Sequence, residues 1–158
     1  SIIAIKNKGI LLCSRTEDVM KFSMEHACIS VTDLERSIKF YNKALGLKVI
    51  KRTDDDEGEF RLAYLGTLDR LWHNEDICEE DALRRPACGR CLLEVIWNRD
   101  KKGEYDLGDN EIHIGFRTDD YEASVAFHKK MGCFHHENKK YRLYFITDPD
   151  GYLIEILG

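Results

Sequence analysis

Two histidines and two glutamates interrupt stretches that otherwise have the composition of buried strands. His26 and His113 each lie in a short apolar stretch, and Glu94 and Glu155 each lie between aliphatic residues. A lone carboxylate in an apolar strand carries a desolvation cost of several kcal/mol unless it is protonated or paired with a cation. Two imidazoles and two carboxylates suit a borderline dication, so the four residues predict one metal site for nickel, zinc or cobalt, with room for water or substrate.

These four residues occur at matched places in an internal repeat. The segment Phe40–Gly46 is echoed by Phe127–Gly132, and His26 and His113 lie at the same distance before these two phenylalanines. Glu94 and Glu155 occupy the same place in two similar apolar segments near the end of each repeat. The repeat therefore predicts two similar modules that place one His and one Glu each around a shared ion.

Each module is expected to contain a strand, a helix and then three strands, which makes the fold class α+β. The first helix should begin at a capping box, Thr32-Asp-Leu-Glu35, and end at Gly46, and the second should end at Gly132. Alternation and turn residues predict the strands, with a turn at Asp148-Pro-Asp-Gly151. The expected strands are 25–31, 47–53, 59–66 and 91–98 in the first module and 111–118, 133–137, 140–147 and 152–157 in the second, and the second helix is expected over 120–131.

The chain divides into three parts on this basis. Residues 1–23 have no counterpart in the second module and are taken as an N-terminal extension of unknown role. The first module covers 24–98 and contains an insertion at 66–90, which is expected to be a loop. The second module covers 99–158.

Composition excludes several classes of protein. The 29 acidic and 24 basic residues are interspersed and give a net charge of -5, which argues against nucleic acid as a partner. No apolar run is long enough to cross a membrane and no secretion signal is evident, so a cytoplasmic protein with reduced cysteines is expected. The Cys88-Gly-Arg-Cys91 pair is a weak redox or zinc motif, and the remaining histidines, His73, His128, His135 and His136, are expected at the surface.

The chain resembles glyoxalase I (lactoylglutathione lyase) of the vicinal oxygen chelate superfamily over most of residues 25–157. The matching segments are Val31–Tyr41 after His26, Leu93–Asn98, Tyr105–Gly108, His113–Gly115 and Asp148–Glu155. The resemblance implies paired βαβββ modules, a cupped eight-stranded mixed sheet around the metal, and a homodimer with sites at the interface.

The resemblance also implies an activity. The family converts the hemithioacetal of methylglyoxal and a thiol, usually glutathione, to the lactoyl thioester, with a metal acting as a Lewis acid. Glu155 is the expected general base and Glu94 its near-symmetric partner for the other enantiomer, while His26 and His113 remain as fixed ligands.

Substrate contacts follow less directly from the pattern. Asn98 matches a family asparagine that contacts the peptide of the thiol. Arginines that some members use for glutathione carboxylates are replaced here by Ser30 and Asp109. Arg117, Lys140 and Arg142, with Lys139, are candidates to replace them, or they are solvated charges, so glutathione or another low-molecular-weight thiol is possible.

Three other functions of the same fold stay open. An acyl-CoA epimerase or an extradiol dioxygenase needs a similar metal cup, although the full His/Glu/His/Glu set favours glyoxalase I. A non-catalytic small-molecule-binding or resistance protein would not need both carboxylates within apolar strands.

Overall fold

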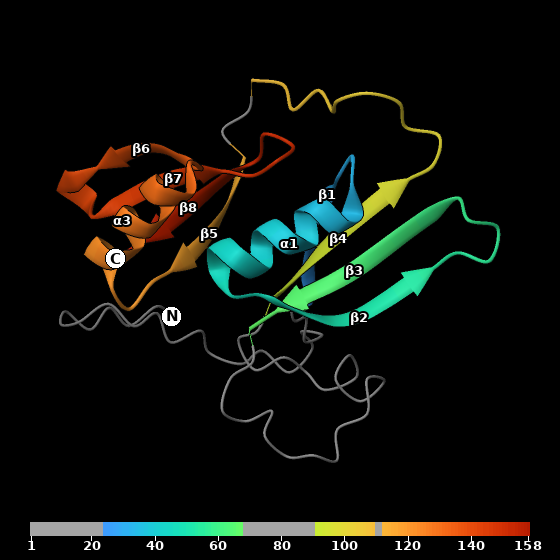
Figure 1. Ribbon diagram of the computed structural model, residues 1–158, viewed down its shortest axis with the longest axis horizontal. Coiled ribbons are helices and arrows are strands. Elements are labelled where there is room, and N and C mark those ends of the chain that lie inside the picture. Colours follow the sequence, from blue (N-terminus) through green and yellow to red (C-terminus); the bar gives the residue numbers. More distant parts are fainter. Residues whose placement is uncertain (1–23, 68–90, 110–111) are drawn as a thin grey trace, which may run out of the picture.

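The repeat seen in the sequence is a repeat of strand order in three dimensions. The computed structural model describes residues 24–67, 91–109 and 112–158. Segment 1–23 and nearly all of the expected insertion lie outside these residues. Figure 1 shows two neighbouring modules, connected by the segment that follows Asn98 and passes over the top in this view.

Within the described residues, each module contains one four-stranded mixed sheet and one α-helix. The first has strand order β1-β4-β3-β2 and the second β5-β8-β7-β6, with the first and last strand of each module parallel and side by side. The α+β class and the paired modules are therefore confirmed, with the eight strands divided between two sheets in one chain. The elements are β1 (His26–Ser30), α1 (Leu34–Leu45), β2 (Lys48–Asp54), β3 (Phe60–Gly66), β4 (Leu92–Asn98), β5 (His113–Arg117), α3 (Tyr121–Met131), β6 (Phe134–Asn138), η2 (Lys139–Tyr141), β7 (Leu143–Thr147) and β8 (Leu153–Leu157).

The two sheets share the same register. Cys28 lies opposite Glu94 in the β1–β4 pair, and Gly115 lies opposite Glu155 in the β5–β8 pair. Each module also has an irregularity at the same place in its second strand, before Lys51 and before His136. The duplication therefore extends to individual backbone positions.

The first helix begins one residue later than its expected cap. Asp33, not Thr32, is the N-cap, and its carboxylate accepts a hydrogen bond from the Arg36 backbone N–H at 3.0 Å. The backbone N–H and hydroxyl of Thr32 instead donate to Asp150 of the second module, and Glu35 pairs with Arg52. The predicted capping box is therefore wrong, because a tertiary acceptor competes for the Thr32 donors. The predicted ends are confirmed, since Gly46 and Gly132 both adopt left-handed φ angles as C-caps.

One predicted strand starts too early. Residues 140–142 were expected to begin the third strand of the second module, but Lys139–Tyr141 forms a turn of 3-10 helix. Arg142 then has a φ of 51°, in the left-handed region that a β-strand cannot contain. The strand β7 begins only at Leu143.

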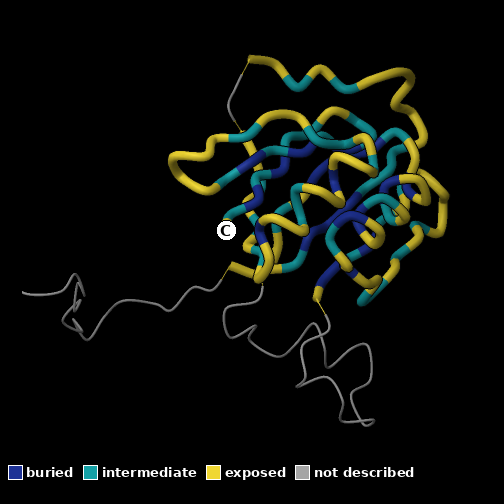
Figure 2. Tube along the Cα trace, turned by 60° about the vertical axis from the view of Figure 1, so that its left-hand side comes forward, coloured by how far each residue is buried: buried dark blue, intermediate teal, exposed yellow. Residues whose placement is uncertain are grey.

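The core lies between the helices and one face of each sheet, where the side chains of alternate strand residues point. Figure 2 shows buried stretches inside the molecule and exposed ones along its outer loops. The most deeply buried large side chains are Tyr41, Tyr144, Leu65, Ile146, Ile154, Val31 and Val95. Because successive strand residues point to opposite faces, the four candidate ligands lie on the face away from α1 and α3, which pack on the core side.

The turn between β7 and β8 joins the second module to the first. The Asp150 side chain is only 2% exposed and accepts hydrogen bonds from the Thr32 N–H at 3.0 Å and the Ser37 hydroxyl at 3.2 Å. Arg36 adds an ion pair at 2.9 Å. Burial alone would raise the pKa of Asp150, but these donors and the Arg36 charge lower it overall. This carboxylate therefore fixes α1 against the second module.

Two further contacts cross the same junction. The buried Tyr41 hydroxyl donates to Asp148 at 2.7 Å, and the Tyr152 hydroxyl donates to the Ser30 carbonyl at 3.0 Å. Asp148 also accepts the backbone N–H groups of Asp150 and Tyr152, so the turn itself is held in one conformation.

His128 is buried at this junction and is not a surface residue, which corrects the expectation from sequence. It is 3% exposed on α3, with Nε2 at 2.9 Å from the Ala44 carbonyl and Nδ1 at 2.8 Å from the Tyr144 hydroxyl. The carbonyl can only accept, so Nε2 carries the proton and Nδ1 accepts from Tyr144. His135 and His136 are exposed as expected, and His73 lies outside the described residues.

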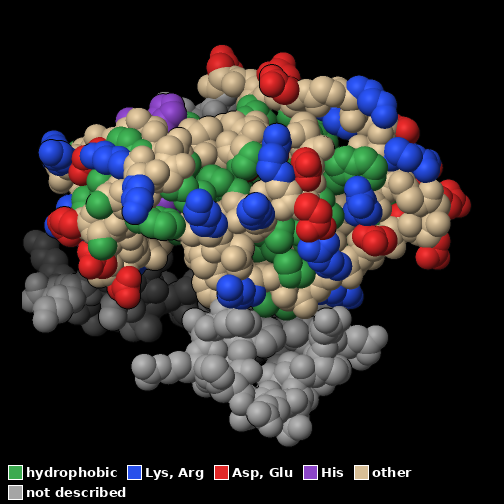
Figure 3. Space-filling view, viewed as in Figure 1, with side chains coloured by type: hydrophobic (Ala, Val, Ile, Leu, Met, Phe, Trp, Pro, Cys, Tyr) green, Lys and Arg blue, Asp and Glu red, His purple; other side chains and the backbone are tan. Residues whose placement is uncertain are grey.

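The surface agrees with the balanced charge of the sequence. Lys and Arg side chains are interspersed with Asp and Glu on the face seen in Figure 3. Among the residues that the structure describes, no helix is long and apolar enough to cross a membrane.

The buried imidazole predicts that stability falls in mild acid. Burial lowers the pKa of His128, partly offset by its hydrogen bond to Ala44, so the folded chain resists a proton that the unfolded chain accepts below about pH 6.5. The free energy of unfolding should therefore decrease as the pH drops through that value. Urea unfolding of the metal-free protein at pH 7.5 and 5.5 measures the difference, which should shrink in His128→Gln. The same change at exposed His135 is the control, and an equal loss of pH dependence there would contradict the assignment.

The inter-module carboxylate predicts a large effect of one substitution. Asp150→Ala leaves the Thr32 N–H and the Ser37 hydroxyl without their acceptor, which should lower the free energy of unfolding by about 1–3 kcal/mol for each buried donor. Asp150→Asn keeps one acceptor oxygen and should cost less. Denaturant melts compare both with Asp56→Ala, an exposed turn aspartate that should change stability little. Equal stabilities for all three variants would rule out this role.

Candidate metal and active site

Each module brings its histidine to its glutamate on the helix-free face of the sheet. In the first, parallel pairing of β1 and β4 places His26 Nε2 at 3.1 Å from Glu94 Oε2. In the second, β5 and β8 place His113 Nε2 at 3.4 Å from Glu155 Oε2. The repeat predicted that each module contributes one His and one Glu to a shared ion, and in the structure the His and Glu of each module are in direct contact.

The two pairs are open on one side. The imidazoles are 43% and 36% exposed, whereas the glutamate side chains are 11% and 17% exposed. The carboxylates are therefore the more buried members of the two pairs, and the imidazoles are the more exposed ones. A second surface or an ion can approach both groups of a pair from this side.

The donor geometry fits a divalent metal. Nitrogen and oxygen ligands lie about 2.0–2.2 Å from zinc, so two ligands of one ion are about 2.8–3.6 Å apart at right-angled or tetrahedral positions. The His26–Glu94 and His113–Glu155 distances of 3.1 and 3.4 Å fall in this range. The separation of the donor atoms in each pair is therefore compatible with two ligands of one ion.

One chain does not gather the four ligands into one cluster. Within residues 24–67, 91–109 and 112–158, no group of three or more His, Cys, Asp or Glu side chains could hold an ion together. His26 and Glu94 form one half of the expected ligand set, and His113 and Glu155 form the other.

The first pair has polar neighbours that sequence analysis did not assign to the site. The Cys28 thiol donates to Glu94 at 3.6 Å. Partial burial, with a smaller contribution from the Glu94 charge, raises the pKa of Cys28 to about 11. Tyr64 packs its ring edge against His26, with centroids 5.5 Å apart. Burial and a hydrogen bond to Glu94 raise the pKa of Tyr64. Tyr64 and Phe145 occupy matching places in the similar segments 60–65 and 141–146, and the strand register places them opposite Glu94 and Glu155.

Two of the expected substrate contacts share a face with a His–Glu pair. Asn98 is four residues after Glu94 on β4 and so projects from the same face. Arg117 is four residues after His113 on β5, is exposed, and donates to the Gly158 carbonyl at 2.7 Å.

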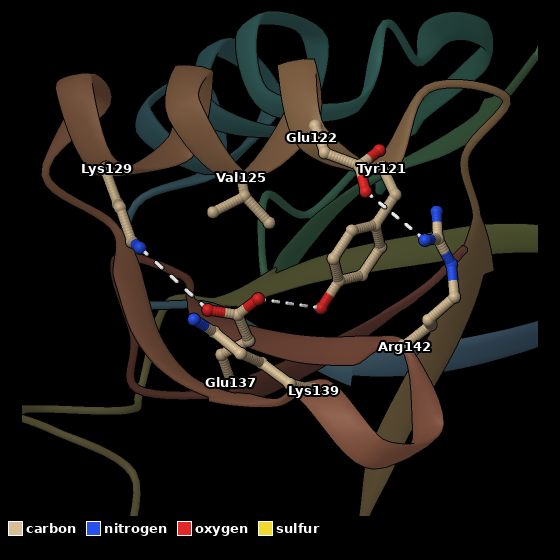
Figure 4. Close-up of a pocket in the computed structure, with 7 residues that line it drawn as sticks. All are labelled: Tyr121, Glu122, Val125, Lys129, Glu137, Lys139 and Arg142. Carbon is tan, nitrogen blue, oxygen red and sulfur yellow. Dashed lines mark hydrogen bonds and ion pairs between the residues drawn. The ribbon is translucent and has the colours of Figure 1, made fainter.

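The other expected contacts lie elsewhere. Arg142 pairs with Glu122 at 3.2 Å and covers the ring of Tyr121, on the helix side of the second sheet. Figure 4 shows it in a pocket between α3 and β6, where Lys129 points toward Glu137 and Lys139 also lines the wall. Lys140 is exposed over the ring of Tyr141. None of these three cationic groups, Lys139, Lys140 and Arg142, has a described contact with either His–Glu pair.

The family follows from a direct comparison. Residues 23–156 match the Glyoxalase/Bleomycin resistance protein/Dioxygenase superfamily. The chain belongs to this family, in agreement with its two βαβββ modules.

Within this family, the chain is similar to lactoylglutathione lyases. Lactoylglutathione lyase of Neisseria meningitidis serogroup A is 33% identical over 138 residues, which cover 84% of this chain and 87% of the relative. Lactoylglutathione lyase of Pseudomonas aeruginosa is 28% identical over 149 residues, with 87% and 82% covered.

A solved structure supports the same family. The trypanothione-dependent glyoxalase I of Leishmania major superposes with a TM-score of 0.68 at 30% identity, covering 87% of both chains. Together with the curated relatives, this likeness confirms the expected enzyme class, a lyase of the glyoxalase I type.

Proposed function

We propose that the chain isomerises the hemithioacetal of methylglyoxal and a low-molecular-weight thiol to the lactoyl thioester, at a divalent metal held by His26, Glu94, His113 and Glu155. The observation that carries this proposal is the duplicated His–Glu contact, 3.1 Å in one module and 3.4 Å in the other, in a chain similar to lactoylglutathione lyases. Nickel, zinc and cobalt all suit two imidazoles and two carboxylates.

A bound dication would supply Lewis-acid polarisation of the two neighbouring substrate oxygens. The chain supplies the base. Glu155 takes the proton from the carbon that carries the thiol sulfur and returns it to the adjacent carbonyl carbon. The electron pair of the C–H bond moves through the enediolate, and the proton of the hydroxyl passes to the oxygen of the neighbouring ketone. The hydroxyl carbon thus becomes the thioester carbonyl and the ketone becomes an alcohol, without any oxidant. Apolar strands around the carboxylates keep them away from bulk water, which favours this proton transfer.

The complete site is proposed to form between two chains. The imidazoles of each pair remain more than one-third exposed, and one chain leaves the two pairs as separate halves. In a symmetric dimer, the helix-free face of one first module would meet that of the partner's second module. Each of two equivalent sites would then take one His–Glu pair from each chain.

Two residues are proposed to contact the thiol part of the substrate. Asn98 and Arg117 are the proposed contacts, because they share faces with the two His–Glu pairs. The name lactoylglutathione lyase, given to the Neisseria meningitidis relative, favours glutathione as the thiol. The similar Leishmania major enzyme depends on trypanothione instead. Free thiols at Cys28, Cys91 and Cys133 support a reducing compartment such as the cytoplasm as the place of action.

The assay that tests this function measures thioester formation at 240 nm with methylglyoxal and either glutathione or trypanothione. Activity should disappear on chelation and return with nickel, zinc or cobalt. Glu155→Gln should lower kcat by about 10²–10⁴-fold, the usual contribution of a general base, with little change in the melting temperature. Glu137→Gln, a carboxylate on the helix side of the sheet, is the matched control. Full activity in Glu155→Gln would remove this residue from the base role, and a metal-loaded protein inactive with both thiols would favour an epimerase or dioxygenase.

Mixed dimers test whether two chains share each site. The double variants His26→Ala/Glu94→Ala and His113→Ala/Glu155→Ala should each be inactive. If sites are shared, unfolding and refolding the two together produces mixed dimers with one intact and one fully altered site. Activity should then recover to about one quarter of wild type, because half of randomly formed dimers are mixed and each has one of two sites. No recovery, with mixed dimers verified by two affinity tags, would place each complete site within one chain.

A further inference from the structure

A pocket on the helix side of the second sheet is separate from the His–Glu pairs. It has a volume of about 440 Å³ and lies between α3, β6 and the turn η2 (Figure 4). Glu137, which lines it, lies opposite the buried Tyr144, whereas its neighbour His136 lies opposite Phe145. Phe145 in turn lies opposite Glu155, so the pocket and the Glu155 carboxylate occupy opposite faces of the sheet. Cavities of this size bind small molecules in other proteins.

Two cationic side chains reach this pocket from one short turn. Lys139 begins the 3-10 helix η2 and Arg142 follows it, and residues three apart in such a helix project from the same side. Arg142 has a φ of 51° and is the one residue other than glycine with a positive φ in the part of the chain that the structure describes. Such a conformation is costly for an arginine and is common where a protein contacts a ligand. The turn therefore holds Lys139 and Arg142 together on the pocket wall.

The charges that line the pocket leave a place for one anionic group. Arg142 pairs with Glu122 at 3.2 Å, and the Lys129 ammonium lies 4.0 Å from Glu137. Lys139 lines the same pocket but forms no ion pair with any carboxylate that the structure describes. Three cationic groups against two carboxylates give the lining a net charge of +1. A bound monoanion would therefore neutralise the pocket.

The cationic groups already in ion pairs can still turn toward such an anion. The side chains of Lys129 and Arg142 are 53% and 59% exposed, and ion pairs this exposed contribute little stability. Arg142 uses one nitrogen, Nη1, to contact Glu122. A guanidinium can offer two parallel N–H groups to one planar carboxylate, so Arg142 retains donors for a ligand.

Apolar groups and a held carboxylate limit what the anion can be. Val125 and the ring of Tyr121 line the pocket, and the Arg142 guanidinium lies over that ring, 4.9 Å from its centroid. The Tyr121 hydroxyl donates to Glu137 at 3.2 Å and keeps this carboxylate, which is 17% exposed, at the pocket. A ligand with a second negative charge would be repelled by Glu137. The pocket therefore favours an anion with a single charge and an apolar part.

We infer that this pocket is a second small-molecule site, which binds a small organic monocarboxylate. Lys139 and Arg142 would bind the carboxylate, and the carbon part of the ligand would lie against Tyr121 and Val125. The site is independent of the proposed function, because the His–Glu pairs lie on the opposite faces of the sheets.

Benzoate is a suitable probe, because it combines one carboxylate with an apolar ring. Calorimetric titration of the full chain should give a Kd on the order of 1 mM, as expected for a ligand of few atoms. Lys139→Gln should weaken binding about 10-fold, because it removes a charged partner of the carboxylate. Lys140→Gln removes the same charge from a side chain that lies over Tyr141 and outside the pocket, and it should change nothing. No binding by wild type, or equal effects of the two substitutions, would overturn the inference.

Two other probes test the class of ligand. Benzamide has nearly the same shape as benzoate without the charge, and it should bind about 10-fold more weakly or worse. Inorganic phosphate carries more charge and has no apolar part, so it should also bind more weakly than benzoate. Equal binding of benzamide would remove the role of the cations, and tighter binding of phosphate would refute a monocarboxylate site.

Two further measurements locate the bound probe. The NMR signals of the Val125 methyl groups should shift when benzoate is added, whereas those of Val49, an exposed residue of the first module, should not. The double variant His113→Ala/Glu155→Ala should bind benzoate as wild type does, because it alters only the opposite face of the sheet. Unshifted Val125 signals, or loss of binding in this variant, would place benzoate outside the pocket and overturn the inference.

Discussion

A carboxylate inside an apolar strand needs a positive or donating partner, and the rest of this architecture follows from that constraint. Parallel pairing of the first and last strand of each module supplies the partner, because it sets His26 beside Glu94 and His113 beside Glu155. A different register of one residue would turn the glutamate into the core among aliphatic side chains. The ligand pair is thus a direct product of sheet topology.

The junction between modules determines which faces stay available. Asp150 and Asp148, in the turn between β7 and β8, accept donors from the first helix, and His128 bonds the end of that helix. These contacts hold the two modules together through their helix sides. The opposite faces, which carry the two His–Glu pairs, are consequently left for a substrate, an ion or a second chain.

The two modules have the same backbone arrangement, but different side chains surround their glutamates. The backbone registers around Glu94 and Glu155 coincide, but the donors around them differ at two positions. The Cys28 thiol donates to Glu94 at 3.6 Å and Tyr64 lies opposite Glu94, whereas Gly115 and Phe145 occupy the matching places beside Glu155.

Local pattern alone determined the α+β class, the helix ends at Gly46 and Gly132 and the four residues of the candidate site, since burial periodicity and glycine caps depend on neighbours close in the chain. It could not show that Asp150 takes the Thr32 donors from the expected capping box, that His128 is buried, or that Arg142 turns to Glu122 on the helix side. Those outcomes depend on groups far apart in the chain that compete for the same partners, and only the folded arrangement decides which partner lies within reach.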